Sequence, residues 1–498
     1  MLSALILIPF IGAGLLAVLP NRFSSSQVKW VAIAIASLAF VVNIIVGYQF
    51  DPNQISFQFE EVIPWIDGIG FNYHLGIDGL SLSLLFLNSF LTVLALMSSD
   101  RDLPRPRLYY ALMLLINVGV SGAFIAQDLL LFFLFYELEI IPLYLLIAIW
   151  GGKRRAYAAT KFLIYTAVSG ILILAAFLGI AFLSGANTFD YETLRSAGLP
   201  FEIQLVLLIA LLIGFGIKIP VFPFHTWLPD AHVEASTPVS MLLAGVLLKL
   251  GTYGLLRFGL GLFLEAWSYL APWLAVAAAI SALYGASCAI AQQDMKKVVA
   301  YSSIGHMAFI LLSLAATTRL SIIATICQTI AHGLISALLF FLVGVVYKKT
   351  GSRDVNQLRG LLNPERGLPV TGSLTILAAM ASAGIPGMVG FVAEFLVFRG
   401  SFPIFPIPTL FCMVGTGLTA VYFLLMINRV FFGRLSDMVT YLPPVGWGDR
   451  VPAIALSIII FILGIQPNWM VRWSEAQVGR LIAPETVAQV TVLNPKGD

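Results

Sequence analysis

Apolar runs of roughly 20 residues, separated by short polar loops, repeat along this chain of 498 residues. A composition of 59% hydrophobic and only 11% charged residues is far from that of a soluble globular domain. Inside a bilayer every backbone polar group must be satisfied by the chain itself, so apolar runs of this length predict membrane-spanning helices. We therefore expect an all-α polytopic membrane protein, 1–498, formed by a single transmembrane bundle.

The hydropathy pattern predicts about 14 transmembrane helices. We place them at 2–20, 29–49, 80–98, 108–126, 129–150, 159–184, 204–225, 239–257, 267–291, 297–316, 320–347, 370–398, 408–428 and 451–467. The first run has no basic segment before it and no small-residue cleavage pattern after it. It is therefore interpreted as a retained span rather than a signal peptide.

Lys and Arg fall mainly on one side of the membrane when successive loops are assigned to alternate sides. Basic residues concentrate in the loops at 101–107, 153–161 and 348–366. The positive-inside rule places these loops on the cytoplasmic side, and both termini and the acidic loop 51–78 on the far side. The net charge is only +3, and no basic stripe with interleaved aromatic residues is present, which argues against a nucleic-acid partner.

Two of the predicted helices contain residues that break helices. The seventh carries Pro220 and Pro223, and the twelfth carries the sequence AGIPG at 383–387. The breaks lie five helices apart, which predicts that 108–257 and 267–428 are repeats inserted in opposite orientations, as in many ion transporters. Each break frees backbone groups that need partners, so each predicts a hydrated pocket near the middle of the membrane.

Six of the ionisable side chains inside the predicted spans are candidates for a functional path. They are Glu137 of the fifth helix, Lys218 of the seventh, Lys249 of the eighth, His306 of the tenth, His332 of the eleventh and Glu394 of the twelfth. An ionisable group at this depth costs several kcal/mol, so it usually faces a partner or a water-filled path. Acids, bases and imidazoles in such a series predict a path for protons.

A nearby carboxylate favours the charged form of a buried lysine, and its withdrawal favours the neutral form. Glu137 is the expected partner of Lys218, because Glu139 lies two residues further on and is expected on nearly the opposite helix face. Histidine titrates near neutral pH and can relay protons between water molecules. The hydroxyl groups of Ser236, Thr237 and Ser240 are candidates for orienting that water.

Each of these residues also has a structural interpretation. Glu137 and Lys218 could form a purely structural ion pair, Glu394 could cap the broken twelfth helix, and either histidine could simply bind a hydroxyl group. Glu139 could serve a neighbouring chain or its own helix, and we keep it with His225 and Ser240 as a possible accessory residue. His225, His232, Asp230 and Glu234 lie near the loop after the seventh helix and are expected at the membrane interface.

The chain shows no sign of a cofactor of its own. Cys288, Cys327 and Cys412 occur singly without the spacing of a metal or iron–sulfur site. No strand followed by GxGxxG and a helix is present, which argues against a bound nucleotide.

Six segments together resemble the antiporter-like membrane subunits of respiratory complex I. They are YELEIIPLYLLIAIWGG (136–152), GIKIPVFPFHTWLPDAHVEASTPVS (216–240), LLKLGTYGLLR (247–257), DMKKVVAYSSIGHM (294–307), QTIAHGLISALLFFLVG (328–344) and GIPGMVGFVAEF (384–395). The resemblance extends from about residue 70 to 435. Within this family the second carboxylate of YELE and the loop GGKRRAYAATKFLIYTA are similar to the subunit 4 type of the photosynthetic NAD(P)H-quinone oxidoreductases of cyanobacteria and chloroplasts. One departure is Ser236, where the family more often has proline.

The resemblance implies that Glu137, Lys218, Lys249 and Glu394 belong to a proton channel in an NAD(P)H/ferredoxin-quinone oxidoreductase that reduces plastoquinone. It implies that quinone, iron–sulfur clusters and electron donor bind other subunits of a large complex in the thylakoid membrane. The partners of this chain are then other membrane-arm subunits, lipid, water and protons. Two alternatives remain: a sodium/proton antiporter subunit, which the same motifs can serve, and a structural membrane scaffold, in which the charged positions would tolerate apolar residues.

Overall fold

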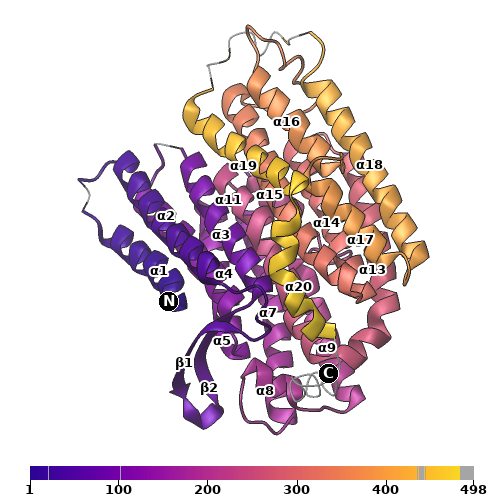
Figure 1. The fold of residues 1–498 in the computed structure, drawn as a ribbon. Coiled ribbons are helices and arrows are strands. Elements are labelled where there is room, and N and C mark those ends of the chain that lie inside the picture. The colour runs from indigo at the N-terminus through magenta and orange to yellow at the C-terminus, as the bar shows by residue number, and fades with distance from the viewer. Residues whose placement is uncertain (21, 101, 435, 437–441, 443–444, 483–498) are drawn as a thin grey trace.

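A computed structural model describes residues 1–498 except 21, 101, 435, 437–441, 443–444 and 483–498. The described residues form a bundle of helices with a β-hairpin at one end (Figure 1). Within them, twelve helices are long and apolar enough to cross a membrane, and α1 and α16 are shorter apolar helices. The predicted all-α membrane class is therefore confirmed.

Every predicted span overlaps one or two of the observed helices. Those in the first part of the chain are α1 (Leu2–Val18), α2 (Ser25–Gln49), α3 (Gly79–Ser98), α4 (Pro106–Ile125), α5 (Leu129–Leu138), α6 (Ile140–Trp150), α7 (Arg155–Leu183), α8 (Tyr191–Ser196) and α9 (Phe201–Lys218). The second part contains α10 (Trp227–Glu234), α11 (Thr237–Leu242), α12 (Leu248–Gly254), α13 (Leu264–Ile290), α14 (Met295–Ala316), α15 (Arg319–Thr350), α16 (Pro369–Ser382), α17 (Val389–Ser401), α18 (Pro406–Val430), α19 (Trp447–Ile465) and α20 (Asn468–Ile482).

The two predicted helix breaks are confirmed. Helix α9 ends at Lys218, and the chain passes through turns containing Pro220 before α10 begins. Helix α16 ends at Ser382, and Gly384 and Gly387 follow with φ values of 70° and 91°. Only glycine adopts such positive φ values without strain, so the glycines in the predicted break allow the chain to turn before α17.

Other interruptions were not predicted. The fifth predicted helix is divided at Glu139 into α5 and α6. The eighth contains two π-helical turns, Leu243–Leu247 and Leu255–Leu260, on either side of α12. Short π-helical turns recur at functional sites and have no signature in apolar periodicity, so the hydropathy pattern could not reveal them.

The acidic loop contains a β-hairpin that the sequence did not predict. Strands β1 (Gln58–Ile66) and β2 (Phe71–Ile77) pair antiparallel around a 3-10 turn, Asp67–Ile69. Gly70 ends the turn with φ 65°, and a Cβ there would lie 2.2 Å from the carbonyl oxygen of Asn187. The hairpin therefore packs directly on the loop that precedes α8.

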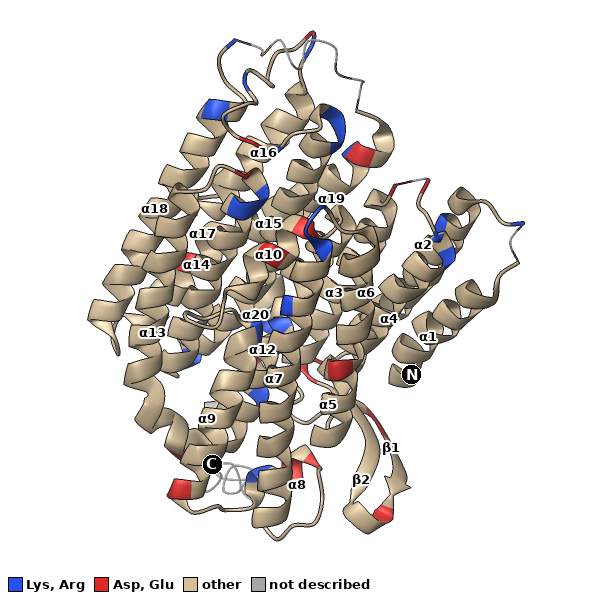
Figure 2. Cartoon of the chain, turned by 180° about the vertical axis from the view of Figure 1, so that it is seen from behind, with Lys and Arg blue, Asp and Glu red and all other residues tan. Residues whose placement is uncertain are grey.

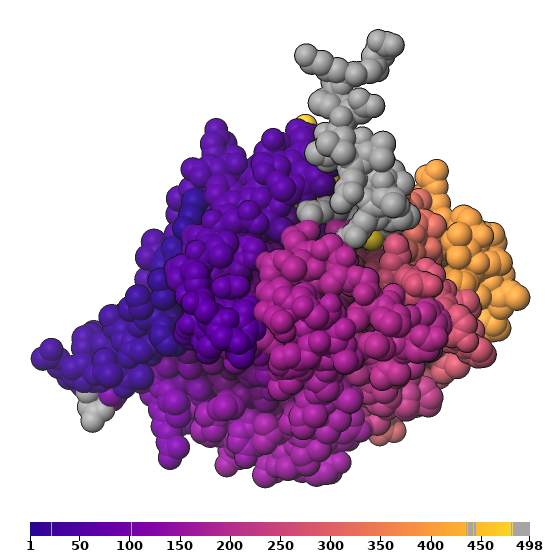
Figure 3. Space-filling view, turned by 90° about the horizontal axis from the view of Figure 1, so that it is seen from below, coloured from indigo at the N-terminus to yellow at the C-terminus, as the bar shows by residue number. Residues whose placement is uncertain are grey.

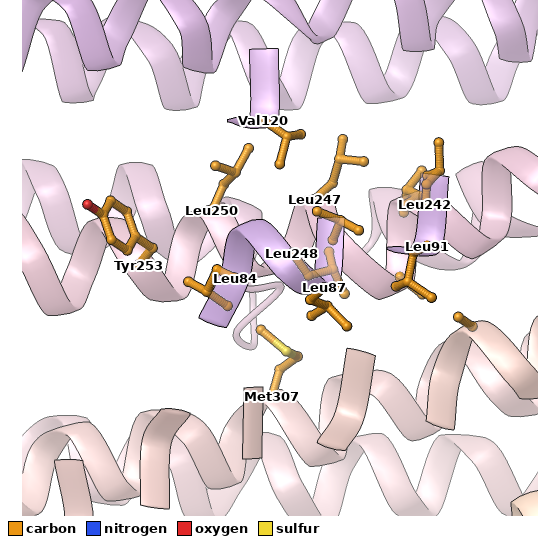
Figure 4. Close-up of a cluster of buried hydrophobic side chains, with 14 of the residues drawn as sticks. Leu84, Leu87, Leu91, Val120, Leu242, Leu247, Leu248, Leu250, Tyr253 and Met307 are labelled. Atoms are coloured by element: carbon orange, nitrogen blue, oxygen red, sulfur yellow. The ribbon is translucent and has the colours of Figure 1, made fainter. Parts of the chain in front are cut away.

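The eighth predicted span lies at the centre of the bundle. Every residue from 238 to 260 is buried. Figure 4 shows Leu247, Leu248 and Leu250 of this segment with Val120 of α4 on one side, and with leucines of α3 and then Met307 of α14 on the other. Any ionisable group on this segment therefore faces protein rather than lipid.

The two ends of the bundle differ in charge. Figure 2 shows Lys and Arg gathered toward the end where α16 begins, and acidic residues on β1 and near α8 at the other end. Seen from the hairpin end, the N-terminal helices, the middle of the chain and the C-terminal helices follow one another across the molecule (Figure 3). The asymmetry agrees with the loop assignment made from the sequence.

Candidate functional site

Lys218 is the last residue of α9, and its side chain is 1% exposed. The helix breaks here, which brings Lys218 to the junction of α5 and α6. Its ammonium group forms an ion pair with Glu139 and lies 4.7 Å from the centre of the Tyr136 ring. A carboxylate and an aromatic face are the two kinds of group that stabilise a buried cation.

The predicted pairing of Lys218 with Glu137 is therefore wrong. The prediction assumed a continuous helix, in which residues two apart point to nearly opposite sides. The helix is instead interrupted at Glu139, which is the last cap of α5 and the first cap of α6. The interruption turns Glu139 toward Lys218, so the residue kept only as an accessory is the partner.

Glu137 occupies a separate place against α7. A Cβ on Gly170 would lie 2.1 Å from Glu137 Oε1, so the glycine makes room for the carboxylate. Glu137 Oε1 is buried and has no hydrogen-bond partner among the described residues. Glu137 lies close enough to Lys218 and Glu139 to interact with their charges but is not part of their ion pair. A role for Glu137 in proton transfer is a proposal.

Lys249 of α12 is fully buried without an ion-pair partner among the described residues. Its ammonium group donates to Ala244 O at 2.6 Å and contacts His332 Nδ1 at 2.7 Å. The π-helical turn explains the first contact. In a regular α-helix Leu248 N–H would bond to Ala244 O, but here it bonds to Leu243 O, which leaves Ala244 O free to accept from Lys249. The unpredicted turn thus supplies one ligand of the predicted lysine.

Glu394 and His306 form a second buried group. His306 Nε2 of α14 lies 3.4 Å from Glu394 Oε1 of α17 and 3.0 Å from Ser382 O, at the end of α16. His306 Nδ1 lies 2.8 Å from Ser302 O. Glu394 makes no capping hydrogen bond at the start of α17, so the alternative role of helix cap is wrong.

The imidazole rings of His306 and His332 connect these two groups. The ring centres are 5.7 Å apart and the planes are inclined by 25°. Lys249, His332, His306 and Glu394 therefore lie in one continuous file through α12, α15, α14 and α17. The break between α16 and α17 provides the acidic end of this file and one of its carbonyl ligands.

The residues that follow the first break are distributed differently from the prediction. His232 is fully buried and stacks on Phe340 with ring centres 4.2 Å apart, so its predicted interfacial position is wrong. Its aromatic partner belongs to α15, far along the chain, so the sequence around His232 gives no sign of this contact. His225 contacts Tyr284 through Nε2 at 3.2 Å, and Asp230 forms an ion pair with Lys161 at 2.8 Å near the basic end.

Sequence reasoning missed Lys296. Its ammonium group is buried and donates to Ala235 O at 2.7 Å, and to His232 O and Ser240 Oγ at 3.3 Å each. It borders a vestibule of about 1070 Å³ at the basic end of the molecule, which Glu234, Ser236 and other polar residues also line. The sequence shows Lys296 only as one basic residue of a polar turn, so burial was the missing signal.

Comparison with protein families identifies most of the chain. Residues 126–419 match the family described as NADH:quinone oxidoreductase/Mrp antiporter, transmembrane. A relative from Synechococcus sp. strain JA-3-3Ab, called NAD(P)H-quinone oxidoreductase chain 4 1, is 43% identical over 478 residues, which cover 93% of this chain and 89% of the relative. A relative of the same name from Nostoc sp. is 39% identical over 495 residues and covers 97% and 91%.

Solved structures share the fold. A chain of the respiratory complex I from Thermus thermophilus superposes with a TM-score of 0.87 at 27% identity, covering 97% of this chain and 100% of that chain. A chain of the Mrp complex from Dietzia sp. gives 0.85 at 22% identity, with 99% of each chain covered.

Proposed function

The chain belongs to the NADH:quinone oxidoreductase/Mrp antiporter family of membrane subunits, and on this premise we propose that it translocates protons in the membrane arm of an NAD(P)H/ferredoxin-quinone oxidoreductase. The file of buried groups from Lys249 to Glu394 carries the proposal. The chain works as one subunit among other membrane-arm subunits. Plastoquinone, iron–sulfur clusters and the electron donor bind elsewhere in the complex.

The ion pair of Lys218 and Glu139 acts as the switch. Both side chains are buried, so a movement that separates them leaves two unpaired charges, at a cost of several kcal/mol for each. Moving a proton away from Lys218 removes part of this cost. A displacement of α5 and α6, imposed by neighbouring subunits, is thereby converted into proton movement toward Lys249.

Lys249 passes the proton to the second half of the molecule. Its contact with His332 Nδ1 at 2.7 Å is within hydrogen-bond reach, the first requirement for direct transfer. His306 and Glu394 then lie further along the same file. Protons are taken up through the vestibule at the basic end and leave from Glu394 toward the end that carries the β-hairpin.

The architecture suits alternating access. We interpret 108–257 and 267–428 as inverted repeats, since one break follows Lys218 in the first and the other precedes Glu394 in the second. Each repeat thus contributes a broken helix and a buried ionisable residue beside it. The basic loops lie on the cytoplasmic side of a thylakoid membrane, and both termini on the lumenal side.

Substitutions in the assembled complex, reconstituted in liposomes, test the function. Lys249→Met and Glu394→Gln are expected to abolish proton translocation while some quinone reduction persists. Arg319→Gln is the matched control, because it breaks an exposed ion pair with Glu475 at 3.1 Å that lies outside the file. A normal proton-to-electron ratio in both file variants would refute the proposal.

The same preparation distinguishes the two alternative functions. A sodium/proton antiporter subunit would show proton flux that depends on a sodium gradient, whereas the proposed subunit pumps without sodium. A structural scaffold would keep full pumping in Lys249→Met. Copurification of electron-input subunits with this chain is expected only for the oxidoreductase.

A further inference from the structure

A small cavity lies in the file, between α14, α15, α17 and the end of α16. His306, His332, Gln328, Glu394 and Ser382 contribute its polar lining, and small or apolar residues close the rest. Its volume is about 10 Å³. One water molecule needs roughly 10–15 Å³ and two to four polar partners, so the cavity has the size and the lining for a single water.

Two of the lining groups carry polar atoms that the protein leaves unsatisfied. Gln328 Oε1 and His332 Nε2 are buried, and neither has a hydrogen-bond partner among the described residues. The side chains belong to residues only 2% and 4% exposed. Buried polar atoms almost always have partners, and these two lie four residues apart on the same face of α15. A shared partner in the cavity accounts for both.

The chemistry of the two atoms is complementary through water. A charged Lys249 can only donate, so His332 Nδ1 accepts from it and the ring hydrogen lies on Nε2. Nε2–H is then a donor, and Gln328 Oε1 is an acceptor. One water molecule can accept from His332 Nε2–H and donate to Gln328 Oε1. The two atoms make no hydrogen bond to each other or to other described residues.

Direct transfer between the two histidines is blocked by their orientation. The rings stack with planes inclined by 25°, so their nitrogen atoms do not point at each other. Both nitrogens of His306 already face carbonyl oxygens, those of Ser302 and Ser382. Because carbonyl oxygens only accept, this arrangement suits an imidazolium paired with Glu394. The next proton acceptor on the file is then the Glu394 carboxylate.

We propose that this cavity is a water-binding site, held by Gln328, through which a proton passes from His332 to Glu394. The proposal rests on the proposed function and assigns Gln328 as a positioning residue for that step. The amide oxygen fixes one hydrogen of the water, which leaves a lone pair toward His332 and the other hydrogen toward the carboxylate.

The proton balance of the step is simple. The Lys249 ammonium group gives a proton to His332 Nδ1 and becomes a neutral amine. His332 releases its Nε2 proton to the water, the water gives a proton to Glu394, and an O–H bond forms on that carboxylate. The imidazole is left with its proton on Nδ1. It regains the starting form when Nδ1 releases this proton to water and Nε2 takes one up from water, with no net transfer.

Gln328→Met in the complex tests the role of the amide, because methionine keeps the length and flexibility of the side chain and removes the acceptor. The rate of proton translocation is expected to fall about tenfold, which is about 1.4 kcal/mol on the barrier of the step. Gln328→Glu retains an acceptor oxygen and is expected to recover most of the translocation. A structural role alone would not distinguish these two variants, since both keep the volume.

Ala331→Val tests the cavity independently. Ala331 lines the cavity, so the added methyl groups displace water without removing any polar group, and translocation is expected to fall to a similar extent. Thr329→Val is the matched control on α15, because its hydroxyl bonds to Thr325 O within the helix. Normal translocation in both Gln328→Met and Ala331→Val would overturn the water site.

An electron-microscopy map of the wild-type complex at a resolution that shows ordered water is the direct observation. Density within hydrogen-bond distance of both Gln328 Oε1 and His332 Nε2 is expected, and its absence would contradict the site. Failure of the site remains distinguishable from failure of the function. In the first case Lys249→Met still abolishes pumping, whereas in the second Lys249→Met pumps normally.

Discussion

Lys218 and Lys249 are both buried, yet their charges are stabilised in different ways. Lys218 has a carboxylate and an aromatic ring. Among the residues that the structure describes, the partners of the Lys249 ammonium group are a carbonyl oxygen and the Nδ1 atom of His332. An ion without a counter-ion in a low-dielectric interior is costly. We therefore propose that Lys249 is the lysine that passes its proton on.

Replacing each glutamate in turn distinguishes their roles. Glu139→Gln leaves Lys218 with an unpaired buried charge, and breaking a buried pair costs about 3–5 kcal/mol. We expect less assembled complex on native gels and no pumping. Glu137→Gln removes no ion pair among the described residues and is expected to assemble at wild-type levels. If Glu137→Gln assembled less well than Glu139→Gln, Glu137 would be the partner of Lys218.

Gly170→Ala tests Glu137 without changing its charge. The new Cβ would lie 2.1 Å from Glu137 Oε1, so the carboxylate has to move. If Glu137 takes part in proton transfer, pumping in liposomes falls while the quinone reductase activity of the complex persists. Gly216→Ala is the matched control, because a Cβ there meets no atom within 4 Å. Equal pumping by the two variants would remove Glu137 from the path.

At the level of single residues, the sequence identified the charged positions but not their contacts. Apolar context was sufficient to find Lys218, Lys249 and Glu394, because charge inside a span stands out. The partner of Lys218 depends on an interruption at Glu139, and Pro142 is its mark in the sequence, because proline has no N–H to bond to Leu138 O at the end of α5. Gln328 was overlooked because a neutral amide in a helix is common, and only its unsatisfied oxygen beside a cavity gives it meaning.

Among the elements, α14 holds the corner between α10 and α11. The first turn of α14 is capped by Asp294, which accepts from Lys296 N–H at 2.7 Å. The side chain of the same lysine reaches the carbonyl oxygens of His232 and Ala235 and the hydroxyl of Ser240. One residue thus fixes the segment that separates the vestibule from the buried file.

Lys296→Met is expected to loosen this corner. Hydrogen bonds from a charged group contribute about 1.5–3 kcal/mol each, and the substitution removes the lysine donor from Ala235 O, whereas His232 O keeps the Ser240 hydroxyl at 3.2 Å. Amide hydrogen exchange in 232–240 should become faster in the purified complex. Lys297→Met, one residue further along and partly exposed, is the control and should leave that exchange unchanged. Slow exchange in Lys296→Met would show that other contacts hold the corner.

Helix breaks illustrate what sequence patterns reveal about elements. Pro220 and the glycines near Gly384 produce breaks through their own backbone chemistry, so both were predictable. The π-helical turns beside α12 and the β-hairpin arise from packing against distant segments. Apolar residues alternate poorly in β1, where most side chains are exposed, so no strand pattern was visible. Local chemistry is readable in one sequence, whereas tertiary packing is not.

At the scale of the whole molecule, His74 joins the hairpin to the loop before α8. Its Nδ1 lies 2.9 Å from Asp190 Oδ1, and Nε2 lies 3.5 Å from Glu60 Oε1. Burial lowers the pKa of His74. The hydrogen bond and charge of Asp190 and the charge of Glu60 raise it by a larger amount, so the net pKa lies above the usual value. Burial raises the pKa of Asp190, but the bonds to His74 and Thr193 bring the net pKa below the usual value.

These opposite shifts give the contact a defined pH window. A raised histidine pKa stabilises the folded contact below about pH 6.5 and loses this effect as pH rises through the folded pKa. A lowered aspartate pKa stabilises it above about pH 3.9 and loses the effect as pH falls. Amide exchange in β2 should therefore be slowest, relative to His74→Gln, between those values. Asp128, which accepts from Asn72 N–H on β2, is unchanged in both proteins.

The orientation of the whole bundle follows from the distribution of charge and can be measured with two single cysteines. Basic loops remain on the cytoplasmic side during insertion, so position 366 is expected there and the hairpin turn at position 68 on the lumenal side. Gly68 and Arg366 are both exposed, and at Gly68 a Cβ meets no atom within 4 Å. In sealed vesicles with the cytoplasmic face outward, and with Cys288 replaced by alanine, an impermeant maleimide should label Arg366→Cys at once. Gly68→Cys should react only after the vesicles are opened. We propose that protons leave from Glu394 toward the hairpin end. Labelling in the opposite order would place that end on the cytoplasmic side and would contradict proton release to the lumen.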